Sequence, residues 1–236
     1  MSSSKATVLA AVLAVLPISA AHALIYKVEF DGLITSSPHT ETSYEPLALG
    51  ASLSGSFFYD TAWDIFVDDQ FDPNTGRGFG PIDLKVHSAS GSETWLGGGF
   101  AQFELADNEP SSGTEDVVDM LLFNFFQHPA GPFLPAPPAC VVCDPIELRQ
   151  ISLVFFDQGP STPFMTSPGV FPVVDGWHSG VEGTLLLEYG PYDNDIDIVA
   201  SLSNYRATVV PEPAEWAFML GGLALTAFIL KRRARD

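Results

Sequence analysis

The chain has 236 residues, 46% of them hydrophobic, and a formal net charge of −19 at pH 7. This apolar content, with Phe at 18 positions, excludes an acidic disordered chain, because such chains lack the side chains that form a core. The excess of acidic residues repels the phosphates of nucleic acids, so we predict that the protein binds no nucleic acid.

The N-terminal segment has the features of a secretory signal peptide. Lys5 precedes an apolar run over residues 6–16, a proline follows, and small residues stand at Ala21 and Ala23. Signal peptidase requires small residues at these two positions, so we predict a signal peptide over residues 1–23 with cleavage after Ala23. The alternative, a membrane-spanning helix, is disfavoured by the short apolar run and by the proline.

Segments in which apolar and polar residues alternate recur along the body of the chain. In the first of them Tyr26, Val28 and Phe30 fall on one face, as in a half-buried β-strand. No window of the body has apolar residues at helical spacing, and Gly and Pro interrupt most segments. From the alternation we predict strands over residues 25–31, 53–59, 82–87, 100–105, 181–189 and 195–209, and from more continuously apolar runs we predict strands over residues 117–127 and 148–156.

These strands predict an all-β fold. About eight strands separated by turn signals are typical of two packed antiparallel sheets, so we predict a two-sheet β-sandwich of jelly-roll or lectin-like type. Residues 24–209 have the length of one domain that forms its core without a metal or a disulfide. The Gly-rich runs at 76–80 and 97–99 carry no phosphate-binding Lys, and we predict that they are flexible turns.

Cys140 and Cys143 stand in a proline-rich loop over residues 128–145. A zinc site needs two further ligands, and a redox pair is usually placed at a helix N-terminus, so the surrounding sequence favours neither. In an oxidising exterior we predict a local disulfide between the two cysteines.

Asp193, Asp195 and Asp197 resemble the first part of a calcium-binding loop, in which alternate carboxylates converge on one ion. However, Ile198 stands where an EF-hand has Gly, and no Glu closes the loop. The second interpretation is that Asp195 and Asp197 face solvent on a strand. Calcium is the one cofactor for which the sequence offers candidate ligands, and we predict no other.

No motif for catalysis is present in the sequence. It has neither the G-x-S-x-G elbow of a serine hydrolase nor the H-E-x-x-H motif of a metalloprotease. Acidic residues are so numerous that carboxylate pairs suited to glycoside hydrolysis will arise by chance. We therefore predict a non-enzymatic protein without catalytic residues, and the alternative is a secreted carbohydrate-active hydrolase.

Large aromatic side chains of the body are candidates for a platform on which a sugar ring stacks. The alternative is that they pack in the core, where large aromatic residues dominate. The candidates are Trp63, Trp95, Trp177, Tyr59, Tyr189 and Tyr192.

The C-terminal segment, residues 210–236, has three parts. Pro211, Glu212 and Pro213 come first, and an uncharged, largely apolar run over residues 216–230 follows. As a helix this run would extend roughly 23 Å, which is short but usable for crossing a hydrocarbon core of about 30 Å. We predict a single transmembrane helix, followed by a basic tail that stays on the cytoplasmic side of the inner membrane. The tail contains Lys231, Arg232, Arg233 and Arg235.

This order of motif, helix and basic tail resembles the PEP-CTERM sorting signal of Gram-negative bacteria. The resemblance implies that a membrane enzyme, exosortase, recognises Pro211, Glu212 and Pro213, cuts nearby and sends the upstream domain to the cell surface or exterior. It also implies a setting, because such proteins typically occur in producers of exopolysaccharide. We therefore predict an exported surface or matrix protein that associates with exopolysaccharide or the envelope.

Overall fold

The computed structural model describes most of the chain between residues 24 and 210. The described residues are 24–37, 45–68, 72–110, 117–126, 129–134, 146–157, 164–173, 176–177, 180–190, 196–210 and 221. The predicted signal peptide and nearly all of the predicted sorting signal lie outside them. No helix within these ranges combines the length and the apolar character that crossing a membrane requires.

The described residues form an all-β structure, which confirms the fold class predicted from the alternation. One short 3-10 helix, η1 (Glu45–Leu47), accompanies the strands. The strands are β1 (Ile25–Ser36), β2 (Ser52–Asp60), β3 (Phe66–Asp68), β4 (Asp72–Gly80), β5 (Leu84–Ser88), β6 (Thr94–Gly97), β7 (Ala101–Pro110), β8 (Val117–Phe125), β9 (Leu148–Asp157), β10 (Val181–Tyr189) and β11 (Ile196–Val210).

The strands join in a single antiparallel sheet, in the order β3-β4-β7-β8-β9-β10-β11-β1-β2-β5-β6. The first strand, β1, lies between β11 and β2, so the two ends of the sheet-forming chain are hydrogen-bonded neighbours. The prediction of two separate sheets therefore differs from the structure. Alternation shows which side chains of a strand face the core, but it does not show which strands are neighbours.

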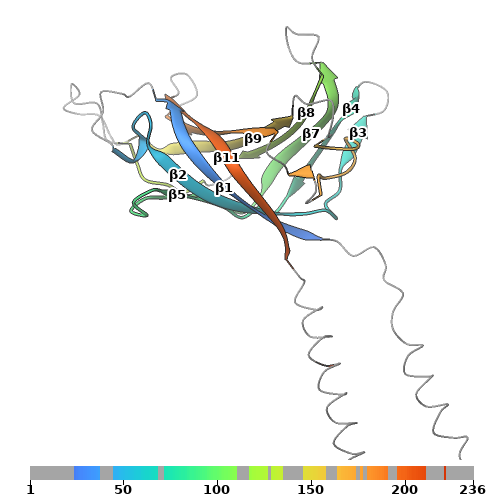
Figure 1. The fold of residues 1–236 in the computed structure, drawn as a ribbon, viewed down its shortest axis with the longest axis horizontal. Coiled ribbons are helices and arrows are strands. Elements are labelled where there is room, and N and C mark those ends of the chain that lie inside the picture. The colour runs from blue at the N-terminus through green and yellow to red at the C-terminus, as the bar shows by residue number, and fades with distance from the viewer. Residues whose placement is uncertain are drawn as a thin grey trace, which may run out of the picture.

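The sheet curls, and its two halves pack against each other over one core. Phe57 on β2 stacks on Phe155 of β9 with the ring centroids 5.5 Å apart, and its centroid lies 5.3 Å from that of Phe123 on β8. Because β2 is hydrogen-bonded to neither strand, these contacts cross the interior. Figure 1 shows the curled sheet, with β2 and β5 at one side and β3, β4 and β7 at the other. The core is sandwich-like although the sheet is continuous.

Two hydrogen bonds between buried aromatic side chains connect elements across this core. Trp95 Nε1 on β6 donates to the Tyr189 hydroxyl on β10 at 2.7 Å. Trp177 Nε1 donates to the Tyr59 hydroxyl on β2 at 3.1 Å, and Tyr59 donates to the carbonyl of Pro172. Buried indole and phenol groups are costly without partners, so these bonds allow large amphipathic rings to fill the interior.

The Gly-rich runs are strand segments, so the prediction that they are flexible turns is wrong at residues 76–80, which lie in β4, and at Gly97, which ends β6. A Cβ atom at Gly78 would overlap the ring of Phe103, and one at Gly80 would overlap the ring of Trp63. These glycines leave room for aromatic rings to pack against the backbone. From the sequence alone, a glycine needed for such packing looks the same as a glycine needed for a turn.

Candidate functional site

A groove of the described structure lies where β10 and β11 separate. The two strands pair from Gly183 opposite Leu202 to Tyr189 opposite Ile196. Beyond Leu202, β11 continues to Val210 beside β1, whereas β10 has its start at Val181. A groove of about 770 Å³ occupies this fork. Its lining consists of Phe156, Trp177, Val181, Glu182, Gly183, Thr184, Ser201, Leu202, Ser203, Asn204, Tyr205 and Arg206.

A β-bulge at Asn204 shapes the groove. Glu29 of β1 pairs with Arg206, but Asp31, two residues later, pairs with Ser203, so β11 contains one additional residue here. Asn204 has a φ of 55°, in the left-handed region that Asn tolerates better than most residues. A bulge of this kind interrupts the pairing and re-aims the side chains that follow it.

The bulge reverses which positions of β11 face the core. Before it, Ile198, Ala200 and Leu202 are buried, all at even positions. After it, Tyr205 and Ala207 pack against the core, at odd positions. Without the additional residue Tyr205 would point to the outer face, so the bulge is what brings this ring into the fork.

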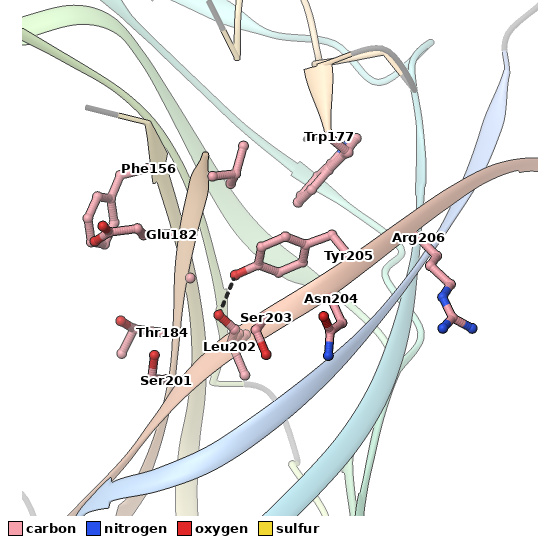
Figure 2. A pocket seen from close by; sticks show the side chains of 12 residues that line it. Phe156, Trp177, Glu182, Thr184, Ser201, Leu202, Ser203, Asn204, Tyr205 and Arg206 are labelled. Atoms are coloured by element: carbon pink, nitrogen blue, oxygen red, sulfur yellow. Dashed lines mark hydrogen bonds between the residues drawn. The ribbon is translucent and has the colours of Figure 1, made fainter. Parts of the chain in front are cut away.

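Contacts on several sides fix the position of the Tyr205 ring in the groove. Its hydroxyl donates to the carbonyl of Leu202 at 3.0 Å, and its ring lies edge-on to Phe155 at 5.7 Å between centroids and 5.9 Å from Trp177. A Cβ atom at Gly183 would overlap the Tyr205 hydroxyl, so the ring needs glycine beneath it. Figure 2 shows Tyr205 between Phe156 and Glu182 on one side and Arg206 on the other.

Charged groups around the groove shift the pKa values of their neighbours. Burial raises the pKa of Tyr205 above its ordinary value, and the charge of Glu182 raises it further, so the phenol stays protonated and can donate. The pKa of Glu29 is lowered, first by the hydrogen bond and charge of Lys27 and then by the charge of Arg206, its cross-strand partner. Asn204 Nδ2 donates to Asp31 Oδ2 at 3.0 Å and holds the rim of the bulge.

Most of the aromatic residues that the sequence offers as a sugar platform belong to the core. Trp95, Tyr59 and Tyr189 are buried, and Trp63 stacks on Phe103. Trp177 alone among the described candidates lines the groove, as a buried wall held by its bond to Tyr59. Tyr192 lies outside the described residues.

The sequence did not single out Tyr205, Asn204 or Gly183 as site residues. The sequence does contain a sign of the bulge. The alternation of β11 breaks between Leu202 and Tyr205, where successive inward positions are three residues apart instead of two. Such a break within a strand indicates a bulge. An Asn inside the break is the residue, after Gly, that most readily adopts the conformation required.

The candidate metal ligands are mostly outside the described residues. Asp193 and Asp195 lie outside the described residues, and Asp197 is an exposed residue of β11. Within the ranges that the structure describes, no group of three or more His, Cys, Asp or Glu side chains could hold a metal ion. The predicted disulfide at Cys140 and Cys143 also lies outside these ranges, and so do the sorting residues Pro211, Glu212, Pro213, Lys231, Arg232, Arg233 and Arg235.

Ser54, His87 and Asp31 stand in one row on the exposed face of the sheet, but in the wrong order for a catalytic triad. Ser54 pairs with His87 on one side and with Asp31 on the other, whereas a serine nucleophile needs the histidine between itself and the acid. His87 Nδ1 lies 2.9 Å from Thr94 Oγ1, and Asp31 accepts from Asn204. The row therefore lacks the geometry that activates a serine.

Two buried carboxylates face each other elsewhere in the sheet. Asp119 on β8 and Asp157 on β9 are cross-strand partners, and Asp119 Oδ2 accepts the amide of Met165 at 3.1 Å. Neither side chain lines the groove at the β10–β11 fork. Both side chains are buried in the interior of the described structure.

Comparison of the chain with family models, with curated protein sequences and with solved structures finds no match.

Proposed function

We propose that the protein is an exported, non-enzymatic component of the cell surface or extracellular matrix. In this proposal signal peptidase removes residues 1–23, and residues 210–236 form a sorting signal with a single transmembrane helix and a basic stop. Exosortase then cuts at or near Pro211, Glu212 and Pro213. The domain of residues 24–209 is delivered outside, where it associates with exopolysaccharide or the envelope.

One observation carries this proposal: the sheet is complete between the two segments that would be removed. Ile25 is paired with Val210, and the eleven strands of the described structure all lie between these two residues. Figure 1 shows the start of β1 and the end of β11 side by side at the lower side of the sheet. Cleavage after Ala23 and beyond Val210 would therefore break none of the strand pairs, and both removable segments would leave the fold at one point.

The groove supports binding in preference to hydrolysis. Glycoside hydrolysis usually needs two carboxyl groups on either side of the bond that is cut. Glu182 is the one carboxylate among the groove residues that the structure describes, and Asp119 and Asp157 are buried elsewhere. A groove lined by aromatic and hydroxyl side chains is the arrangement expected of a binding site.

The test is intact-mass analysis of the protein recovered from the membrane and exterior fractions of a host that carries exosortase. We expect the wild type to begin at Leu24, to lack the residues after the motif and to lie outside. Glu212→Ala should retain Asp236 and stay in the inner membrane, whereas Glu215→Ala, a matched change outside the motif, should be processed normally. A wild-type protein that still ends at Asp236 would overturn the proposal.

A further inference from the structure

We infer that the groove at the β10–β11 fork binds an uncharged sugar ring of a polysaccharide, with Tyr205 as the surface on which the ring stacks. This inference deepens the proposed function and rests on it for the source of the ligand, a glycan outside the cell. The binding chemistry itself follows from the residues of the groove.

The aromatic surface is held in place before any ligand arrives. The hydrogen bond from Tyr205 to Leu202, the edge contact with Phe155 and the glycine at position 183 together define one ring position. A pyranose ring presents C–H groups on its flat faces, which pack against an aromatic face. Because the Tyr205 side chain loses little freedom on binding, most of the contact energy is available for affinity.

Neutral polar groups line the same groove as this aromatic surface. Thr184 and Ser201 are cross-strand partners at outward positions of β10 and β11, and Ser203 and Asn204 continue the polar side of the groove along β11. Hydroxyl groups both donate and accept hydrogen bonds, and an amide offers one acceptor and two donors. Such a set matches the hydroxyl groups around a sugar ring, which also donate and accept.

The electrostatics favour an uncharged sugar. Arg206, the one cation among the described lining residues, lies opposite Glu29, and Glu182 stands on the far side of the groove. Asp31 adds a further acid at the rim, and the whole chain carries a formal net charge of −19. A uronic acid or a sulfated sugar would meet net repulsion here, which a neutral hexose would not.

The geometry of β11 disfavours an added peptide strand, the other ligand that an open strand edge can take. Strand addition requires a regular row of backbone donors and acceptors. The bulge at Asn204 interrupts this row at the groove, and bulges on open edges are a known device against strand pairing. A sugar does not depend on a regular edge.

The experiment is calorimetric titration of the purified full chain, kept soluble with a detergent that has no sugar headgroup. The neutral probes are cellotetraose, mannotetraose and galactotetraose, the charged probe is tetragalacturonate, and an extended acid-free decapeptide represents strand addition. We expect saturable binding of at least one neutral probe. We also expect weaker binding of tetragalacturonate at low salt, with the difference shrinking at about 1 M salt, where charges are screened beyond about 3 Å.

Variants separate the stacking surface from general damage. Tyr205→Leu should weaken binding of the neutral probe about tenfold or more, because it removes the aromatic face and keeps a large apolar side chain. Tyr205→Phe retains the ring and should stay within about threefold of wild type. Gly183→Ala should displace Tyr205 and mimic Tyr205→Leu, whereas Gly98→Ala, at a glycine with open space around it, should bind normally. Far-UV circular dichroism checks that each variant is folded.

Three results would overturn the inference: no saturable binding of any neutral probe, tighter binding of tetragalacturonate or of the peptide, or equal binding by folded Tyr205→Leu and wild type. Each of these results is independent of processing, which is scored on the mass of the C-terminus. Neutral-glycan binding by a chain that is never cut at the motif would remove the sorting proposal and leave the groove assignment in place.

Discussion

At residue 204 a single backbone conformation decides which side chains of β11 face the core. Asn204 adopts a φ of 55°, and the additional residue in the strand moves Tyr205 and Ala207 inward. The cost of the left-handed region is small for Gly, moderate for Asn and about 1–2 kcal/mol for other residues. The identity of this residue therefore affects both stability and the position of the tyrosine.

Substitutions at Asn204 test this conclusion. Asn204→Gly should keep the bulge and change the free energy of unfolding by less than about 1 kcal/mol, with the exposed bond to Asp31 lost. Asn204→Val should have a free energy of unfolding about 1–2 kcal/mol lower than that of Asn204→Gly, because a β-branched residue is strained at this φ. Urea unfolding followed by circular dichroism measures both, and equal stability of the two variants would contradict the assigned bulge.

Three tyrosine hydroxyls make the protein sensitive to alkaline pH. Burial raises the pKa of Tyr59, Tyr189 and Tyr205 above the ordinary value near 10. The unfolded chain therefore loses these protons first, so their contribution to stability is full below about pH 10 and is lost as the pH rises further. For the well-buried Tyr59 and Tyr189 the loss is at most about 1.4 kcal/mol per pH unit for each.

The measurements are the urea midpoint between about pH 9 and about pH 11, and the tyrosinate absorbance of the native protein. We expect the midpoint to fall over this range and the tyrosinate signal of the native state to stay below that of the unfolded chain. Tyr205→Phe should show a shallower fall than wild type. A native chain whose 6 tyrosines all ionise as in the unfolded state would contradict the burial of these hydroxyls.

At the scale of elements, a buried hydrogen bond connects the edge strand β6 with β10, the middle strand of the sheet. Trp95 of β6 is fully buried and donates to Tyr189 of β10. Tyr189 also donates to the carbonyl of Pro132 at 3.2 Å. Its hydroxyl therefore links β10 to two segments that are distant in sequence, β6 and the segment around Pro132. The curl of the sheet depends on such contacts between strands that are not neighbours.

Tyr189→Phe should destabilise the protein by about 1–3 kcal/mol, because the buried indole of Trp95 loses its acceptor. The matched control is Tyr26→Phe, at a buried tyrosine that stacks on Tyr59 at 5.3 Å and on which Trp95 does not depend. Urea unfolding compares the two variants. Equal losses would mean that the Trp95–Tyr189 bond adds nothing to the stability of the curl.

At the scale of the whole molecule, the pairing of β1 with β11 closes the sheet-forming chain on itself. Ile25 and Val210 are partners, so the strands form a self-contained unit between them. A chain of residues 24–210 should therefore show the same urea midpoint as the full chain and a circular dichroism spectrum dominated by strands. A chain that stops at Ser203 lacks the last partners of β1 and should unfold at lower urea. A helical spectrum of the 24–210 chain would contradict the fold.

The alternation of side chains, together with two more continuously apolar segments, was sufficient to predict the fold class and the eight strands expected from the sequence, including the last strand through Val209. It did not reveal β3, β4 and β6, because glycines in β4 and the shortness of β3 and β6 hide their alternation. The groove was also beyond prediction, since it forms where Gly183, Trp177 and Tyr205 come together from three separate segments.

What the sequence by itself determined is the all-β character of the body and the inward face of each alternating strand, because period-two patterning is a local property of the chain. The sorting prediction is likewise a matter of sequence alone, since it depends on the order of Pro211, Glu212, Pro213 and the segments that follow. Only the tertiary structure decided that the strands form one curled sheet, that β1 lies beside β11, and that Tyr205 faces the fork. These features depend on strand neighbours and on the backbone conformation of Asn204, and packing between distant segments selects both.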